Sequence, residues 1–581
     1  MSTDASEIEW QLDAIDLRPV VRFLEARAND ADPGLVRSVA TRGTSFVDVY
    51  LDTDDRRFER GGCALRVRRT SSRAGARAEA ALVVLGNGLG GETGLPGARL
   101  ISQQLAQPEL QALAAADGPV GERVRAVAGS KPLLLLFEVR TRRRRFLLEA
   151  DGVAVGELAL DETSIRPSDG GPPARLRRIE IDVPSARRAE LEPFVDELRE
   201  ACGLQPALLS TFEAGLLSAG LGRPPVETFG PTDVTPASTI GEVAMAVLRR
   251  HFAMLRAREP GTRLGDDIEE LHDMRVASRR LRAALSLFAD VLPADVLKLG
   301  DELRWVGGVL GAVRDLDVQL EQLDSWLTEL PEEDREPLLV LRHLLELQRA
   351  TARNEMLAAL DSRRYESFSN RFARALRAQR VRRSSRFSQA ALAVAPDLIE
   401  RRFRPVRKGG RSITADSPAS DYHRLRIRAK RLRYALEFLA DVYPGHTRPV
   451  VKRLVALQDV LGLHQDAVVA IDRLRHLTAE HGGELPVATI FAMGEVAGRY
   501  RESMTALEAD FPALFAQATG KRWRAFSRHL QEQAASQPTA DEPTGVEEQS
   551  GDAPARTTPS WPGLTDRDVD HDDSPPTRIT P

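Results

Sequence analysis

An internal repeat constrains the C-terminal half of this chain more than any other feature. The segment HDMRVASRRLRAAL at 272–285 aligns without gaps on HRLRIRAKRLRYAL at 423–436, and VLGAVRD at 309–315 aligns on VLGLHQD at 460–466. Both matches have the same offset, since 423 − 272 and 460 − 309 both equal 151. Two matches at one offset indicate a duplicated unit. We therefore expect a pseudo-twofold arrangement in which each half supplies one basic helix to a shared centre.

The region around this repeat has the apolar periodicity of α-helices. Segments such as EVAMAVLRRHFAMLRARE and KRLVALQDVLG repeat apolar residues at helical spacing. We expect an all-α helical bundle over 239–530, with repeats at about 239–385 and 390–530.

Residues 1–217 differ, because short runs typical of strands dominate there. Runs such as FVDVYLDT, CALRVRRT and RRIEIDV alternate with a few helical stretches. The pattern predicts an α+β domain dominated by an antiparallel sheet. Residues 218–238 include a stretch rich in Pro, Gly and Thr and are expected to link the two domains. Residues 531–581 contain 11 Asp or Glu against three Arg and few large apolar residues, which predicts a disordered acidic tail.

Composition narrows the class of protein. The sequence has two cysteines, Cys63 and Cys202, which are too few for a disulfide framework or a cysteine-rich metal site. The N-terminus lacks the features of a signal peptide, and no uncharged apolar run approaches the roughly 18 residues of a membrane span. We expect a soluble cytoplasmic protein with no membrane partner. The net charge of −4 conceals a basic block, 363–453, with 24 Lys or Arg against seven Asp or Glu, which favours an anionic partner.

Each repeat carries a stripe of cations along one predicted helix. At 100° per residue, four residues of each copy fall on one side, and apolar residues such as Leu281 and Leu432 fall on the other. The stripes consist of His272, Arg275, Arg279 and Arg282, and of His423, Arg426, Lys430 and Arg433. Like charges at this spacing repel unless anions neutralise them. Guanidinium groups suit phosphate oxygens, so both stripes are predicted to bind phosphate.

One stripe alone has another interpretation, a solvent-exposed basic helix neutralised by acids such as Glu270 or Asp273. The repetition at a fixed offset favours a binding function. A histidine on the stripe could hydrogen-bond phosphate and gain charge as the pH falls. Metal ligation by the two histidines has weak support, because no acid shares their stripe three or four residues away.

The segments HDMRVASRRLRAALSLF, LGAVRDLDV and HRLRIRAKRLRYALEFL resemble the CHAD family, the conserved-histidine α-helical domains, across roughly 239–530. The resemblance implies a bundle of two similar four-helix halves whose basic residues bind inorganic polyphosphate on a surface or in a central pore. It requires no cofactor in this domain. Asp315 and Asp466, each four residues after a glycine of the second motif, are interpreted as structural or as partners of the arginines.

The N-terminal domain contains charged pairs at the i, i+2 spacing that places side chains on one face of a strand. The pairs are Glu7 and Glu9; Arg66 and Arg68; Arg140 and Arg142 with Arg144; and Glu180 and Asp182. If the sheet closes into a β-barrel, these groups would face one polar lumen. Carboxylates holding a divalent cation and arginines holding phosphate oxygens would suit a metal-bound triphosphate. The alternative is that these charged residues form an ordinary solvent-exposed face of the sheet and bind no ligand.

YLDTDDRRFERGGCALRVRR at 50–69, with EIEWQL and LALDET, resembles the CYTH family of triphosphate tunnel enzymes over roughly 6–217. The resemblance implies an eight-stranded antiparallel tunnel, Mg or Mn ions, and triphosphatase or adenylate cyclase chemistry. The family signature Glu-x-Glu-x-Lys matches at Glu7 and Glu9 but has Gln11 at the third position. A second family lysine, on the strand at about 79–86, is also missing. A neutral amide cannot replace a cation that positions phosphate, so turnover is in question.

Three functions remain open on the sequence alone. The first is binding of inorganic polyphosphate or another polyanion, with association with polyphosphate granules and a degenerate tunnel. The second is metal-dependent hydrolysis of triphosphate or polyphosphate by the tunnel. The third is nucleic-acid binding, which lacks a recognisable motif. Gln11 favours the first.

Overall fold

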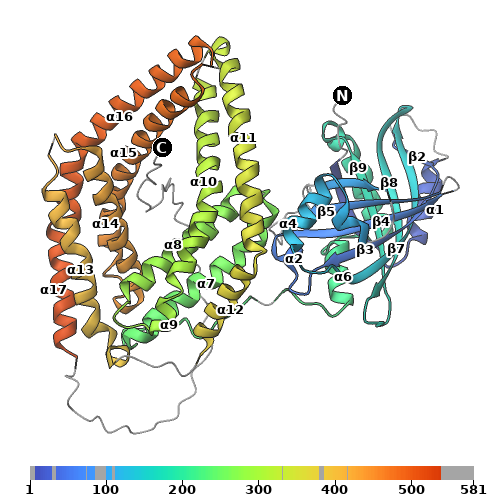
Figure 1. Ribbon diagram of the computed structural model, residues 1–581. Coiled ribbons are helices and arrows are strands. Elements are labelled where there is room, and N and C mark those ends of the chain that lie inside the picture. The colour runs from blue at the N-terminus through green and yellow to red at the C-terminus, as the bar shows by residue number, and fades with distance from the viewer. Residues whose placement is uncertain are drawn as a thin grey trace, which may run out of the picture. The chain divides into compact units, whose positions relative to one another are not determined.

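The computed structural model describes residues 7–28, 35–72, 75–85, 100–106, 111–224, 226–329, 331–378, 385–414, 416–483 and 485–537 (Figure 1). The chain divides into two compact units. The sheet unit comprises Met1–Val226 and Ala257–Glu270, and the helical unit comprises Glu227–Arg256 and Leu271–Pro581.

An antiparallel sheet forms the body of the sheet unit. Its strands are β1 (Glu7–Asp13), β2 (Arg37–Ala40), β3 (Thr44–Asp52), β4 (Cys63–Ser72), β5 (Gly75–Val84), β6 (Leu100–Leu105), β7 (Leu134–Ala150), β8 (Val153–Pro167), β9 (Ala174–Val183) and β10 (Gln205–Pro206). The strand order is β10-β1-β9-β8-β7-β3-β4-β5-β6, and β2 pairs separately with β7. Within the described residues no ladder joins β6 to β1, so the sheet is open there and closure into a barrel is not confirmed.

Helices cover the apolar face of this sheet. They are α1 (Arg18–Ala28), α2 (Arg57–Arg60), α3 (Gln111–Ala115), α4 (Pro119–Ala128) and α5 (Arg188–Cys202). A further helix, α6 (Thr211–Ser218), packs on the other face, where Phe212 lies against Tyr50 and Phe137. Alternate residues of β8 and β9, such as Leu158 and Ile181, pack with Leu24 of α1 and Leu198 of α5. The other half of the face packs on α4 and buries its Val124. The period of two along each strand leaves the charged residues on the opposite face.

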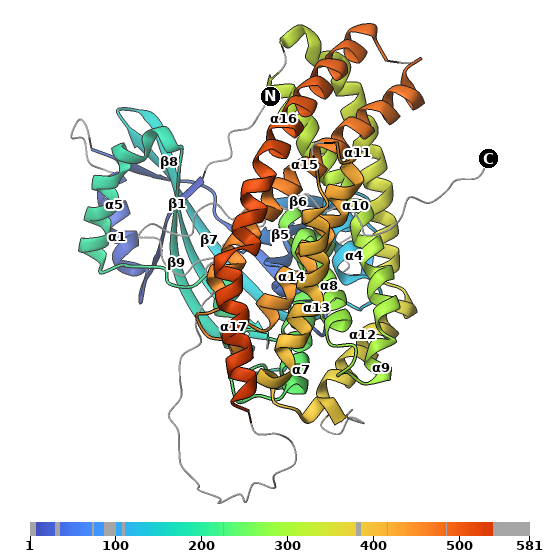
Figure 2. The ribbon, with the colours of Figure 1, turned by 90° about the vertical axis from the view of Figure 1, so that its left-hand side faces the viewer.

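Two similar sets of helices build the helical unit. They are α7 (Ile240–Leu264), whose first part belongs to it, α8 (Ile268–Leu287), α9 (Ala294–Leu297), α10 (Gly300–Glu329), α11 (Glu332–Leu360), α12 (Arg363–Arg377), α13 (Ala391–Arg411), α14 (Ala419–Phe438), α15 (Arg448–His481), α16 (Val487–Thr519) and α17 (Lys521–Ala535). The bounds of α8 and α14 differ by 151 at both ends, since 419 − 268 and 438 − 287 both equal 151. Helices α10 and α11 pack against each other, as do α15 and α16 (Figures 1 and 2).

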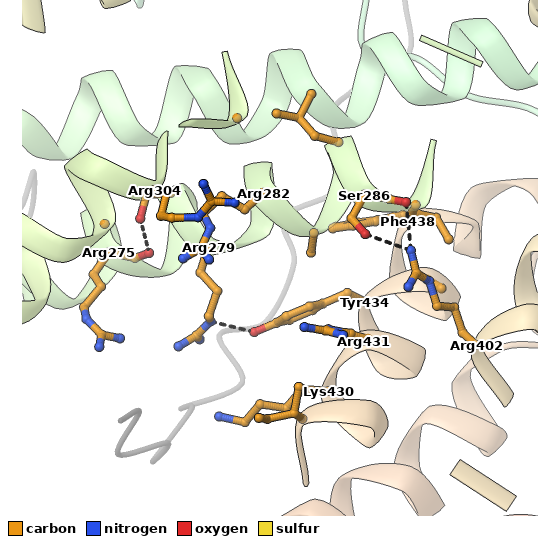
Figure 3. A pocket seen from close by; sticks show the side chains of 18 of the residues that line it. Arg275, Arg279, Arg282, Ser286, Arg304, Arg402, Lys430, Arg431, Tyr434 and Phe438 are labelled. Carbon is orange, nitrogen blue, oxygen red and sulfur yellow. Dashed lines mark hydrogen bonds between the residues drawn. The ribbon is translucent and has the colours of Figure 1, made fainter. Parts of the chain in front are cut away.

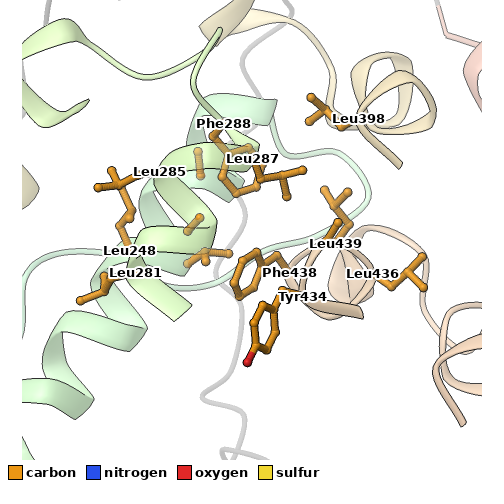
Figure 4. Close-up of a cluster of buried hydrophobic side chains, with 14 of the residues drawn as sticks. Leu248, Leu281, Leu285, Leu287, Phe288, Leu398, Tyr434, Leu436, Phe438 and Leu439 are labelled. Carbon is orange, nitrogen blue, oxygen red and sulfur yellow. The ribbon is translucent and has the colours of Figure 1, made fainter. Parts of the chain in front are cut away.

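A single hydrophobic core joins the two repeats. The apolar sides predicted for the basic helices are buried, including Leu281 and Leu285 from α8 and Leu436 from α14 (Figure 4). Leu432 of α14 belongs to the same core. Burial of such a side chain contributes roughly 1.5–3 kcal/mol. The core therefore fixes both helices with their charged sides turned away from it. A separate cluster, with Trp326 and Leu474 among its members, closes the far ends of the long hairpins.

The tail begins later than the sequence indicated. Helix α17 continues to Ala535, and residues up to Gln537 belong to the described structure. The helix persists because Trp523, Phe526 and Leu530 recur at helical spacing and bury an apolar face. The rest of the predicted tail, 538–581, lies outside the described residues.

Candidate functional site

A cavity of about 400 Å³ lies in the helical unit between the polar sides of α8 and α14 (Figure 3). Eight of its lining residues are cations and one, Asp301, is an acid. The cations are Arg275, Arg279, Arg282, Arg304, Arg402, Arg426, Lys430 and Arg431. Asp301 is itself within 2.6 Å of Arg304. Both repeats therefore contribute to one strongly cationic cavity.

Neighbouring side chains hold several of these cations in place. Arg275 on α8 lies 3.4 Å from a carboxylate oxygen of Asp315 on α10. A methyl group added at Gly311 would come within 3.4 Å of the Arg275 guanidinium, so the glycine lets that group lie close against α10. Arg402 on α13 donates hydrogen bonds to the carbonyl and hydroxyl of Ser286, at 2.8 and 3.0 Å. These contacts preorganise the cations around the cavity.

Three lining cations are buried, which is unusual for such residues. Arg275 is 8% exposed, Arg426 2% and Lys430 7%. Removal of charge from water is costly unless opposite charge or hydrogen bonds compensate it. Arg275 has such a partner in Asp315, and guanidinium forks also match the geometry of phosphate oxygens, so an anionic ligand could add to this compensation.

The sheet unit presents a second charged surface, on the sheet face opposite α1, α4 and α5. Arg68 on β4 donates two hydrogen bonds, each 2.8 Å long, to Asp48 on β3, and Arg66 lies 4.0 Å from the same carboxylate. Arg143 on β7 contacts both Asp161 on β8 and Glu180 on β9. Arginines and acids from six neighbouring strands, β1 included through the contact between Asp13 and Arg178, thus share one face.

Family comparisons agree with this division. A CYTH domain model matches residues 22–213, and a CHAD domain model matches residues 246–475. The chain joins a CYTH domain to a CHAD domain. This confirms the two resemblances seen in the sequence.

Solved structures are similar to each domain. The CHAD domain from the plant Ricinus communis is 29% identical and covers 50% of this chain and 96% of its own, with a TM-score of 0.42. PptA from Streptomyces chartreusis is 22% identical and covers 48% of this chain and 99% of its own, with a TM-score of 0.39. A putative adenylyl cyclase from Hippeastrum, described as having a dominant triphosphatase activity, is 16% identical and covers 38% and 98%, with a TM-score of 0.28. No curated protein matches the chain.

The CHAD stripes predicted from the sequence contribute five of their eight residues to the cavity, namely Arg275, Arg279, Arg282, Arg426 and Lys430. The other three lie elsewhere. His272 is half-buried outside the lining, and His423 pairs through Nδ1 with Oε1 of Gln465 at 2.8 Å. Arg433 is buried 3.6 Å from Glu437. His423 thus contacts a neighbouring helix, α15, and Arg433 contacts a residue of its own helix.

Four residues of the CHAD cavity were missed by sequence reasoning. Arg304 and Arg402 come from α10 and α13, at positions outside the repeated motifs. Arg431 is on α14 but outside the predicted stripe. Tyr434 could have been found by comparing the two repeats, because Ala283 occupies the equivalent position in the first copy.

In the CYTH domain the structure corrects the choice of arginines on β7. Arg140, Arg142 and Arg144 are exposed on the face that carries Phe146, opposite the acids. Their neighbours Arg143 and Arg145 instead share a face with Asp161 and Glu157. Four consecutive arginines, 142–145, make the parity of the strand ambiguous in the sequence, and a one-residue error exchanges the two faces. Arg66 and Arg68 do lie on the charged face.

The predicted metal ligands of the CYTH domain are only partly described. Glu180 and Asp182 share the charged face, whereas the side chains of Glu7 and Glu9 lie outside the described residues. Burial, together with the neighbouring Glu180, raises the pKa of Asp182 to about 6. A cation there would relieve that repulsion. In the described part of the chain, however, no three His, Cys, Asp or Glu residues are grouped as metal ligands. The carboxylates present do not by themselves make a metal site.

Gln11 lies directly opposite Glu180 in the β1–β9 ladder. Its side-chain oxygen is buried and has no hydrogen-bond partner in the described structure. A lysine at this position would place an ammonium group among the acids of the tunnel face. The neutral amide of Gln11 does not supply that positive charge.

One described helix, Arg448–Glu480, is long and apolar enough to cross a membrane by length and composition, with a mean hydropathy of 1.4 in its best window. Within the CHAD bundle 56% of that window is buried, and core helices of soluble proteins pass the same test.

Proposed function

We propose that the CHAD domain of this chain binds inorganic polyphosphate in the cavity between α8 and α14, and that the CYTH domain contributes phosphate contacts with little turnover. The observation that carries the proposal is the cavity's charge, eight cations against one carboxylate, drawn from both repeats. Such a charge is suited to a ligand with many negative groups.

The spacing of the cations favours a chain over a single phosphate group. Arg275 and Arg282 are separated by seven residues of helix, or about 10 Å along its axis. Arg426 and Lys430 face the same cavity from α14. A ligand that contacts all of them must be extended, and a phosphate polymer is extended and evenly charged.

A triple variant, Arg279→Gln, Arg282→Gln and Lys430→Gln, tests the proposal. Glutamine keeps much of the side-chain length and polarity but removes the charge. A charge-assisted hydrogen bond contributes roughly 1.5–3 kcal/mol, so long-chain polyphosphate should bind the variant at least about tenfold more weakly. By analogy with counterion release from single strands, the salt slope should fall by about 2.

The matched control removes three exposed cations outside the cavity, Arg522, Arg524 and Arg528 on α17. It has the same net charge as the triple variant. Equal loss of affinity in both variants would indicate non-specific attraction. Unchanged affinity in the triple variant, with its circular dichroism preserved, would overturn the proposal. Stronger binding of DNA than of polyphosphate would favour the nucleic-acid alternative.

A polyphosphate-binding CHAD domain would direct the chain to polyphosphate granules in the cytoplasm. The proposal predicts that a fluorescent fusion gathers on granules and that the triple variant spreads through the cell. Diffuse signal from the unmodified chain in granule-rich cells would contradict this localisation.

A further inference from the structure

A second row of arginines runs along α14 beside the row that faces the cavity. Arg424, Arg428 and Arg431 follow one another at spacings of four and three residues, so they share one side of the helix. Arg431 lines the cavity, whereas Arg424 and Arg428 do not. The row therefore begins at the cavity and continues about 10 Å away from it.

This row follows the line of contact between α13 and α14. The Arg428 guanidinium lies over Gly409 of α13, where an added methyl group would come within 2.6 Å of its Nη1. Near the other end of the row, Arg402 of α13 also lines the cavity. Burial, and then the nearby charge of Arg431, lower the pKa of Arg402. Cations from both helices thus lie along one line of contact.

The first repeat lacks this row, which makes it an internal comparison. Subtracting 151 from 424, 428 and 431 gives Asp273, Ala277 and Arg280, and subtracting it from 402 gives His251. Ala277 is fully buried, and Arg280 lies 3.2 Å from Glu437. Burial, with help from Arg280, lowers the pKa of His251 to about 3, so that it is neutral at pH 7. Four cations of the second repeat correspond to one in the first.

We propose that an extended polyphosphate chain leaves the cavity over the second repeat, along the contact between α13 and α14, where Arg424 and Arg428 form an outer subsite. The inference rests on the proposed function, because it extends the same ligand beyond the cavity. It also gives the site a direction that the pseudo-twofold fold alone would not have. Chains long enough to reach the outer subsite gain contacts that short chains cannot make.

The double variant Arg424→Gln and Arg428→Gln tests this subsite against the control double variant Arg522→Gln and Arg524→Gln. Both remove two partly or fully exposed arginines from the CHAD domain. Affinities of the full chain are measured for tripolyphosphate and for polyphosphate of about 100 units at several salt concentrations. The subsite variant should bind the long polymer about three- to tenfold more weakly, with a salt slope lower by roughly 1 to 1.5. Its affinity for tripolyphosphate should be unchanged.

The outcomes separate the two proposals. If the unmodified chain binds neither ligand, the proposed function fails. If it binds the long polymer and the two double variants bind equally well, the outer subsite is overturned while the cavity remains. An equal loss for tripolyphosphate and the long polymer in the subsite variant would also overturn it, because the two arginines would then act on the cavity itself.

Discussion

Arg279 of the first repeat donates a hydrogen bond from Nε to the hydroxyl of Tyr434 in the second, over 2.8 Å (Figure 3). The tyrosine ring also lies under the guanidiniums of Arg280 and Arg433, at 5.4 and 5.5 Å from its centroid. One aromatic side chain therefore positions cations of both basic helices. Its equivalent in the first repeat, Ala283, can do neither.

We predict that Tyr434→Phe weakens polyphosphate binding by about three- to tenfold. The ring and its packing remain, but the hydroxyl that orients Arg279 is lost, and such a neutral hydrogen bond is worth roughly 0.5–1.5 kcal/mol. Titration with polyphosphate measures the effect, and Tyr422→Phe is a control in the same helix outside the cavity lining. Identical affinities for the two variants would show that the hydroxyl does not position Arg279.

The pH dependence of the CYTH domain should report Asp182. Because its pKa is raised to about 6 in the folded state, the protonated form is the favoured one, and the stability it contributes is present below pH 4 and lost as the pH rises through 6. Asp182→Asn mimics the protonated form. It should raise the melting temperature at pH 7.5 by roughly 2–4 °C, about 1 kcal/mol after screening by solvent, and have a distinctly smaller effect at pH 4.5.

The exposed Asp169→Asn provides the control for that comparison. An increase in melting temperature that is the same at both pH values would show that the effect of Asp182→Asn does not come from the ionisation of Asp182. Added Mg or Mn that stabilises the unmodified chain at pH 7.5, but not Asp182→Asn, would identify Asp182 as a metal ligand.

Gln11 should limit catalysis by the CYTH domain. We expect slow release of phosphate from tripolyphosphate with Mg or Mn, and an increase of at least about tenfold in Gln11→Lys, because the lysine restores the cation of the family signature opposite Glu180. Gln11→Met, similar in size and uncharged, is the control. A rate in the unmodified chain equal to that of a lysine-bearing relative, and lost in Glu7→Ala, would show that the tunnel is active as it stands.

The sequence predicted the helical domain well because two independent signals agreed there. The repeat located both basic helices, and the apolar residues on their far sides, such as Leu281 and Leu432, are indeed buried. It did not predict that Arg275 and Arg426 would also be buried. A helix between two layers has no fully exposed side, and the second layer, α10 with Gly311, is distant in the sequence.

The existence of an antiparallel sheet was easier to predict than the number of its strands or the faces of their residues. The resemblance implied eight strands, and the described residues form ten. Strand identity follows from local composition, but the face that a residue occupies depends on parity, and a β-bulge between Ile8 and Trp10 shifts the register of β1. On β7 the same dependence on parity puts Arg143, rather than Arg142 or Arg144, on the charged face, where it contacts Asp161. The face on which each residue lies depends on pairing between strands that are far apart in the chain, so a local sequence pattern cannot predict it.

Removal of residues 538–581 should leave the CHAD domain folded. The cut falls after the last described helix, so Trp523, Phe526 and Leu530 remain buried, and the stacking of Trp523 on Phe403, with ring centroids 3.8 Å apart, is retained. The removed segment has ten acids and three arginines, too dispersed to compete strongly with a phosphate polymer, so polyphosphate affinity should rise by less than about threefold. The melting temperature should change by no more than about 2 °C, since surface changes without buried contacts have little effect.

Trp523→Ala is the contrasting variant, with an expected cost of roughly 3–5 kcal/mol. A truncated chain that melts as early as Trp523→Ala would mean that the segment after Gln537 packs on the bundle.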